Sequence, residues 1–227
     1  MKIPQAIGLI PDGNRRWAKQ QNLLATQGHL KGYKNIEKFC DWCFDKKIKH
    51  IFIYVFSYEN WQRSAEEVGY LMKLFARAIK NNIQQANKRN YQFRFIGRRD
   101  KFSAKLIKLI ESAEQITAKN LAGSLNICVS YGGRQEIVDA VKKIVAKKID
   151  NQKINEDLIS QHLYVPEVPD LDLIIRTGNN PRLSNFMPWQ STYAELFFSP
   201  TLWPAFSEQE FNEIIDKFSK RQRNFGK

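Results

Sequence analysis

Short apolar runs, rich in β-branched and aromatic residues, recur along the chain between longer amphipathic segments. The runs cover residues 6–10, 50–57, 91–97, 124–132, 171–178 and 195–199. Most are continuous rather than alternating, which is typical of strands buried on both faces. Helical spacing predicts helices within residues 29–47, 64–90, 103–121 and 134–149, and a last helix that opens at Ser207. Since no linker-like stretch interrupts this alternation, it predicts a single α/β domain over residues 1–227, with a largely parallel sheet.

Polar clusters follow several of these predicted strands. Ligands of parallel α/β sheets bind beyond the carboxyl ends of the strands. The first strand leads into residues 12–17 (DGNRRW), the second into 57–63 (SYENWQR), the fourth into 131–134 (YGGR) and the fifth into 176–185. We therefore expect several arginines and the two carboxylates Asp12 and Glu195 to converge on one rim of the sheet.

The stretch after the first strand has the composition of an anion site. Gly13 and Asn14 suit a tight turn into a helix, whose free N–H groups would face the crevice. Arg15 and Arg16 can add charge-assisted contacts to phosphate. Asp12 would repel a bare phosphate, but it suits a Mg²⁺ ion held between carboxylate and phosphates. The alternative is that Asp12 only caps the next helix.

Two further clusters have both a functional and a structural interpretation. Arg176, Arg182 and Ser184 suit a second phosphate site, although a surface salt-bridge cluster is the alternative. The indole of Trp61, among polar neighbours, could stack on a base or stabilise a cation, whereas a core position is the alternative.

Composition narrows the class of protein. The net charge of +13 favours an anionic partner, which could be nucleic acid, a phosphorylated small molecule or a membrane surface. No apolar run approaches the roughly 20 residues of a membrane span, and the first residues do not resemble a secretory signal, so we expect a cytoplasmic protein. Cys40 and Cys43 form a CxxC, but both lie on the apolar stripe of a predicted helix, which favours buried thiols over a metal site.

Several catalytic signatures are absent from the sequence. It contains no P-loop, no glycine-rich dinucleotide fingerprint, no nucleophile elbow and no aspartate-rich DDxxD motif. A nucleic-acid-binding domain, suggested only by charge, would need basic and aromatic residues along a continuous groove. Here the aromatic residues lie mostly in the predicted strands and helix stripes, so we expect no nucleic acid partner.

Seven segments, in order and spacing, resemble the conserved regions of the cis-prenyltransferases, of which undecaprenyl diphosphate synthase is the best-known type. They are IPDGNRRWA, GHLKG, FSYENW, NICVSYGGR, IRTGNNPRLSNF, AELFF and LWP, and the resemblance extends from Ile7 to about Gly226. It implies a six-stranded, mostly parallel sheet and a homodimer. It also implies Mg²⁺-dependent extension of an allylic diphosphate, such as farnesyl diphosphate, by isopentenyl diphosphate, with an undecaprenyl-type lipid carrier as the expected product.

The resemblance also assigns roles to residues. Asp12 matches the essential aspartate, and Glu195 matches a metal-linked glutamate. The allylic diphosphate pocket is matched by Gly13, Asn14, Arg16 and His29, beside Arg15 and Trp17. The positioning loop is matched by Ser57, Tyr58, Glu59, Asn60, Trp61 and Arg63, with Asn60 as a proton relay or orienting group. Arg176, Arg182, Leu183 and Ser184 match the isopentenyl diphosphate pocket, and Arg221, Arg223 and Gly226 match the tail that completes the partner subunit's site.

Departures from the family pattern keep alternatives open. Ala25 stands where the family usually has an arginine, Pro181 where it often has a histidine, and Ala205 where it often has an acidic residue. These differences leave room for a catalytically silent partner subunit. Val55 stands where the family often has alanine facing the product tunnel, which suggests a product shorter than undecaprenyl. The basic surface also suggests peripheral contact with an anionic membrane.

Overall fold

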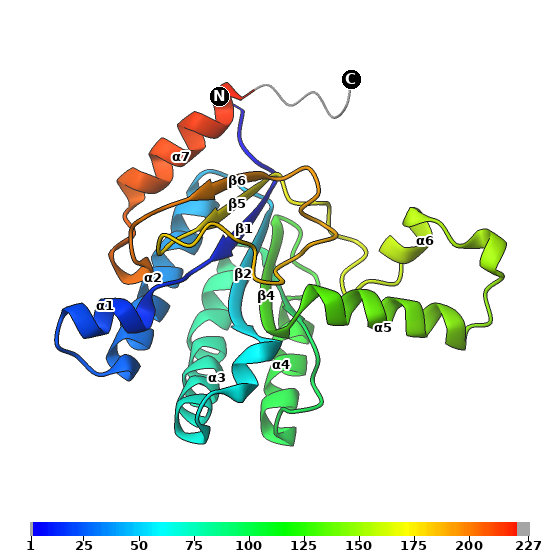
Figure 1. Ribbon diagram of the computed structural model, residues 1–227, viewed down its shortest axis with the longest axis horizontal. Helices are drawn as coiled ribbons and strands as arrows, with labels where there is room; N and C mark the ends of the chain where they lie inside the picture. The colour runs from blue at the N-terminus through cyan, green and yellow to red at the C-terminus, as the bar shows by residue number, and fades with distance from the viewer. Residues whose placement is uncertain (1, 222–227) are drawn as a thin grey trace.

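The computed structural model describes residues 2–221 as one α/β domain built on a six-stranded sheet (Figure 1). The strands are β1 (Ala6–Ile10), β2 (His50–Ser57), β3 (Tyr91–Ile96), β4 (Gly123–Tyr131), β5 (Leu173–Arg176) and β6 (Glu195–Phe198). Their order is β3-β4-β2-β1-β5-β6, and every neighbouring pair is parallel. The predicted fold class is confirmed, and the sheet is parallel throughout.

The predicted helices are present, with additions. The α-helices are α1 (Asn14–Gln20), α2 (Ala25–Asp45), α3 (Ala65–Lys88), α4 (Ala104–Thr117), α5 (Gly133–Ala146), α6 (Glu156–Ser160) and α7 (Glu208–Lys220). Single-turn helices lie at η1 (Tyr58–Gln62), η2 (Asn151–Lys153) and η3 (Trp203–Ala205). Serine caps begin two of the α-helices as the sequence suggests: Ser64 accepts from the Glu67 N–H at 3.3 Å and Ser207 from the Glu210 N–H at 3.2 Å. The sequence pattern did not predict α6 or the three short helices.

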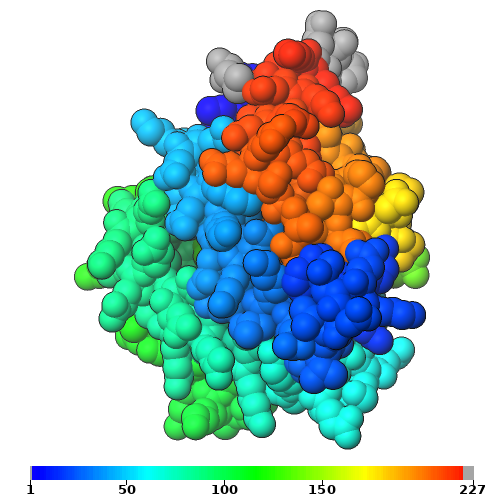
Figure 2. Space-filling model, turned by 90° about the vertical axis from the view of Figure 1, so that its left-hand side faces the viewer, coloured from blue at the N-terminus to red at the C-terminus, as the bar shows by residue number. Residues whose placement is uncertain are grey.

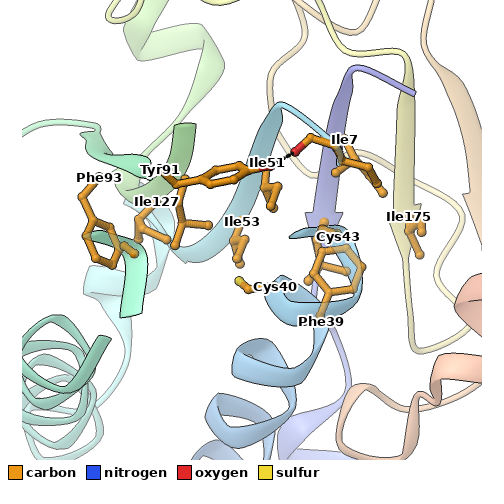
Figure 3. Packing of buried hydrophobic residues seen from close by; sticks show 14 of the residues in the cluster. Ile7, Phe39, Cys40, Cys43, Ile51, Ile53, Tyr91, Phe93, Ile127 and Ile175 are labelled. Carbon is orange, nitrogen blue, oxygen red and sulfur yellow. Dashed lines mark hydrogen bonds between the residues drawn. The ribbon is translucent and has the colours of Figure 1, made fainter. Parts of the chain in front are cut away.

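The two faces of the sheet carry separate hydrophobic clusters. One face packs against α2, α3, α4 and α7, and Figure 3 shows Phe39, Cys40 and Cys43 of α2 beneath the strands β1 and β2. Both thiols are buried, and burial raises the pKa of each, so the structure agrees with their interpretation as core residues.

The other face packs against the segment 164–194. There the buried Glu136 carboxylate accepts a hydrogen bond from the Tyr131 hydroxyl at 2.6 Å and another from the Gln190 side chain at 3.1 Å. Among the described residues, no helix is long and apolar enough to cross a membrane.

Candidate active site

A cavity of about 1560 Å³ opens at the carboxyl edge of the sheet. Its mouth is polar and lies where β1, β2 and β5 end. Its body is mostly apolar and extends between α2, α3 and strands β2, β3 and β4, with a lining that includes Ile53, Phe56, Met72, Phe75, Phe93, Phe95, Leu125 and Ile127. Polar residues, among them Glu37 and Asn82, line it between α2 and α3. The cavity therefore suits a molecule with an anionic head and a long apolar tail.

Asp12 lies at the mouth, two residues beyond β1, in a fixed backbone position. Its carbonyl oxygen accepts hydrogen bonds from the Thr177 hydroxyl at 2.8 Å and the Trp203 N–H at 3.0 Å. The following residue, Gly13, has φ of 116° and is the N-cap of α1. A side chain at this left-handed position would be strained, which accounts for the glycine. Asp12 itself does not cap the helix, so the capping alternative does not hold.

The Asp12 carboxylate is surrounded by donors. Its Oδ2 accepts hydrogen bonds from Arg176 at 2.9 Å and Asn180 at 3.0 Å, and its Oδ1 lies 3.3 Å from an Arg16 nitrogen. Burial alone would raise the pKa of Asp12. The hydrogen bonds from Arg176 and Asn180 and the charges of both arginines outweigh burial, so the pKa lies below its ordinary value. Asp12 is an ionised, oriented carboxylate at neutral pH.

Arg176 is the buried cation of the mouth, with a side chain only 4% exposed. Besides its contact with Asp12, its Nη1 donates to the Arg182 carbonyl at 2.5 Å and to the Ser184 hydroxyl at 2.7 Å. Its Nε is buried without a hydrogen-bond partner among the described residues. Because an unpaired buried donor is costly, this guanidinium is suited to an anion in the cavity.

The α1 side of the mouth is held close to α2. A Cβ atom at Gly32 of α2 would lie 2.0 Å from Asn14 Oδ1, so only glycine allows this approach. Asn14 Oδ1 is buried without a partner among the described residues. Across the mouth, Arg16 donates to the Gly178 carbonyl at 2.7 Å.

A third group of charges surrounds Glu67, which the sequence analysis did not single out. The distances from its carboxylate oxygens to side-chain nitrogens are 2.9 Å for Arg63, 3.4 Å for His29 and 3.9 Å for Arg15. Burial, together with the Arg63 charge, lowers the pKa of His29 and outweighs the effect of Glu67, so the imidazole is neutral at pH 7. The i, i+4 spacing of Arg63 and Glu67 was a sequence signal that could have indicated this group.

The positioning loop contributes only some of its expected residues. Ser57, Glu59, Asn60 and Arg63 line the cavity. Asn60 Oδ1 accepts a hydrogen bond from the Ser57 N–H at 3.0 Å, and Asn60 lines the cavity. Glu59 accepts from Asn185, another lining residue that the sequence analysis did not single out, at 2.9 Å.

Four of the residues expected to bind substrate are not among those that line the cavity. The Trp61 indole donates to the Ser130 hydroxyl at 2.9 Å and packs on Phe56 and Phe102, so the structure favours the alternative of a packed tryptophan. The remaining three also lie elsewhere: Tyr58 faces two cations, Leu183 packs on the second core cluster, and Trp17 is half-buried outside the cavity.

Glu195 does not lie at the rim, and that expectation was wrong. It begins β6, opposite Leu173, whereas Asp12 follows the end of β1, where Ile10 pairs with Arg176. Five positions at about 3.3 Å per residue place Glu195 and Asp12 on the order of 16 Å apart along the strand direction. Glu195 instead pairs with Arg221. Arg223 and Gly226, the other tail residues, lie outside the described residues.

The mouth offers few protein ligands for a divalent cation. Among the described residues, no group of three or more histidine, cysteine, aspartate or glutamate side chains could hold a metal ion. Mg²⁺, however, is commonly bound by one or two carboxylates together with substrate phosphates and water. Asp12 supplies one ionised carboxylate beside an arginine cluster, which is enough for such a shared site.

Comparisons with known proteins agree with this geometry. The profile of the prenyltransferase family described as "Putative undecaprenyl diphosphate synthase" matches residues 10–226. An isoprenyl transferase of Rickettsia felis is 44% identical, over 97% of this chain and 93% of the relative. A tritrans,polycis-undecaprenyl-diphosphate synthase (geranylgeranyl-diphosphate specific) of Thermococcus kodakarensis is 42% identical, over 99% and 88%.

Two solved structures share the fold. Lavandulyl diphosphate synthase from Lavandula x intermedia, in complex with dimethylallyl diphosphate, superposes with a TM-score of 0.96 and 31% identity over 99% of each chain. A probable undecaprenyl diphosphate synthase from Campylobacter jejuni superposes with a TM-score of 0.84 and 33% identity over 100% of each chain. This chain belongs to the undecaprenyl diphosphate synthase family of cis-prenyltransferases, and it is an isoprenyl transferase.

Proposed function

We propose that this protein condenses isopentenyl diphosphate with an allylic diphosphate, such as farnesyl diphosphate, to give a long cis-polyprenyl diphosphate. One observation carries the proposal: a charged site and a hydrophobic cavity are continuous. The Asp12–Arg176 cluster lies at the mouth of a cavity whose body is mostly apolar. Diphosphates fit the mouth, and a hydrocarbon chain that grows by five carbons at each addition fits the body.

The residues of the mouth have separate tasks in this reaction. The allylic C–O bond breaks, pyrophosphate leaves, a C–C bond forms and a proton is lost. Gly13, Asn14, Arg16 and the free N–H groups of α1 would hold the allylic diphosphate. Arg182, Ser184 and the unpartnered Nε of Arg176 would hold isopentenyl diphosphate. Asn60 would orient the group that takes the proton, since a neutral amide is a poor base.

Mg²⁺ is part of the proposal. Asp12 would hold the ion together with diphosphate oxygens, and the ion would neutralise the charge of the leaving pyrophosphate. Glu195 is too far from Asp12 in the same chain to share that ion. Asn180 would keep the Asp12 carboxylate turned toward the site while leaving room for a ligand on Oδ1.

The size of the cavity favours a long product. The cavity measures about 1560 Å³, the mouth included. Val55 lines the cavity. The long, mostly apolar body nevertheless supports a product of many isoprene units, longer than the one that Val55 alone suggests.

A product analysis tests the proposal. Purified protein would receive Mg²⁺, isopentenyl diphosphate and, separately, dimethylallyl, geranyl or farnesyl diphosphate, with Asp12→Asn protein as the matched blank. We expect a ladder of products that ends near the undecaprenyl length. A stop after one or two additions would assign a short-chain synthase, and no turnover with any primer would assign a silent subunit.

We also propose a homodimer. Val138, Val141 and Val145 are 49%, 45% and 68% exposed and form an apolar stripe on α5, while Leu196 and Phe198 are half-exposed on the edge strand β6. Such a surface is typical of a subunit interface. Light scattering should show a dimer for the native protein and a monomer for Val141→Glu. A native monomer would contradict the proposal.

A further inference from the structure

The charged residues of α2 are divided between two faces of the helix. Its acidic residues Glu37, Asp41 and Asp45 lie toward α3. The Asn82 amide donates to Glu37 at 3.0 Å, and Arg89 pairs with Asp41 at 3.6 Å and with Asp45 at 3.0 Å. The negative charge of the helix is therefore engaged within the fold.

The outer face of α2 is basic and has no partner within the part of the chain that the structure describes. Lys31, Lys34 and Lys38 recur at i, i+3 and i+7 and are all exposed. None of them forms an ion pair within 4.0 Å with a described carboxylate. In line with them, one residue before the helix begins, stands Leu24, which is 72% exposed.

The turn between α1 and α2 joins this face to the mouth of the cavity. Lys19 and Leu23 are exposed and line the cavity. From Gly13 to Lys34 the chain contains five basic and no acidic residues. Figure 2 shows this dark-blue segment on the face turned to the viewer, and in Figure 1 the turn lies at the left edge of the molecule.

We propose that Lys19, Leu24, Lys31, Lys34 and Lys38, here called the α2 outer surface, dock on the headgroups of an anionic lipid bilayer. Lysines in a row are drawn to a negatively charged membrane surface, and one exposed leucine at the end of the row can enter the interface. Because the turn lines the cavity mouth, docking brings the mouth to the headgroup level. This last step rests on the proposed function: an amphiphilic product that leaves the mouth would pass directly into lipid.

Vesicle co-sedimentation of the full chain without substrate tests docking independently of catalysis. The probes are vesicles of phosphatidylglycerol and phosphatidylcholine in equal parts, and vesicles of phosphatidylcholine alone. We expect binding to the anionic vesicles only, falling as salt rises. The triple variant Lys31→Gln, Lys34→Gln, Lys38→Gln should lower the partition coefficient at least tenfold, and Leu24→Ser about threefold.

Matched control variants carry the same types of substitution at exposed positions outside the α2 outer surface. Lys105→Gln, Lys108→Gln, Lys119→Gln removes the same charge from exposed positions on and after α4. Leu121→Ser matches Leu24→Ser, because Leu121 is 87% exposed next to the amino end of β4. Both controls should bind vesicles as the native chain does. None of the substituted positions lines the cavity, so turnover of a water-soluble primer should be retained in detergent solution.

Three results would overturn the proposal. Equal losses in the test and control triple variants would show attraction by net charge alone. Absence of native binding to anionic vesicles would rule out the surface as a membrane contact. A change of oligomeric state in the α2 triple variant, without loss of vesicle binding, would assign the surface to a second copy of the chain. Failed turnover with intact vesicle binding would contradict the proposed function and leave docking supported.

Discussion

The mouth and the body of the cavity share strand β2, but different forces hold them together. At the mouth, Asp12, Arg176 and Asn180 are held by directional hydrogen bonds of 2.9–3.0 Å. In the body, most lining side chains from β2, β4 and α3 are aliphatic or aromatic and make no hydrogen bonds toward the space they surround, apart from a polar group between α2 and α3 that includes Glu37 and Asn82. Directional contacts define where charge develops in a reaction, whereas an apolar wall defines only how much hydrocarbon fits. The mouth should therefore control rate and the body product length.

Asp12→Asn gives the sharpest test of this division. The substitution keeps the shape of the side chain but removes the charge that faces Arg176 and Arg16. We expect kcat to fall about 10³-fold, while any remaining products keep the native length distribution. Steady-state kinetics with product sizing measures both. A shift to shorter products would show that the mouth also sets length.

Arg176→Lys tests the forked guanidinium. Lysine keeps the charge but cannot contact Asp12, Ser184 and an anion at once. We expect kcat/KM for isopentenyl diphosphate to fall about 10²-fold. The matched control is Arg99→Lys, since Arg99 pairs with Glu114 at 2.8 Å and does not line the cavity. Equal losses in the two variants would contradict a special role for Arg176.

Asn180→Ala removes one donor to Asp12 while leaving the arginines in place. We expect about a tenfold loss of turnover, because groups that orient a ligating carboxylate have effects of this size. The Mg²⁺ concentration for half-maximal rate should rise as well, measured by titration at saturating substrates. Asn180→Asp, which places a second carboxylate beside Asp12, should not restore the native rate. An unchanged Mg²⁺ requirement in the alanine variant would remove Asn180 from this role.

Leu125→Trp tests the body. Leu125 lines the cavity on β4, and the larger ring would fill space that a growing chain uses. We expect shorter final products, with the rate of the first addition within about threefold of native, since nothing at the mouth changes. Leu125→Met, which conserves volume, is the control. Native-length products from the tryptophan variant would show that the chain follows another route.

The smallest expected effect is a change in the pH dependence of stability through His29, which lines the cavity. The folded protein holds His29 neutral with a pKa below its ordinary value of 6.5. As pH falls below about 6.5 the unfolded chain binds a proton that the folded chain does not, so the free energy of unfolding decreases. The contribution is at most about 1.4 kcal/mol per pH unit. Urea unfolding between pH 7 and 5 should show a shallower decline for His29→Gln, and an identical decline would contradict this assignment.

Much of the fold follows from local pattern, because a strand buried on both faces must be apolar along its length. The runs at residues 6–10 and 50–57 became β1 and β2 without change of bounds. The short helix α6 was not predicted because its five residues give too little periodicity. Asp12, Arg176, Arg182 and Ser184 were found from their types and positions after strands. Glu67, Asn180 and Asn185 were not. Asn180 and Asn185 contact carboxylates distant in sequence, and two of the three partners of Glu67, Arg15 and His29, are distant as well.

The sequence by itself determined the class of this protein: an alternation of strands and helices, polar clusters after the strands, and motifs specific enough to indicate cis-prenyl transfer. Only the tertiary structure decided which residues share the mouth. In the folded chain Trp61 packs inside the domain, and Glu195 lies at the amino edge of the sheet, opposite the mouth. A large, mostly apolar cavity lies beside the sheet. The physical reason is that residue type and spacing encode local preference. Strand register and helix packing, which depend on the whole chain, decide which side chains meet.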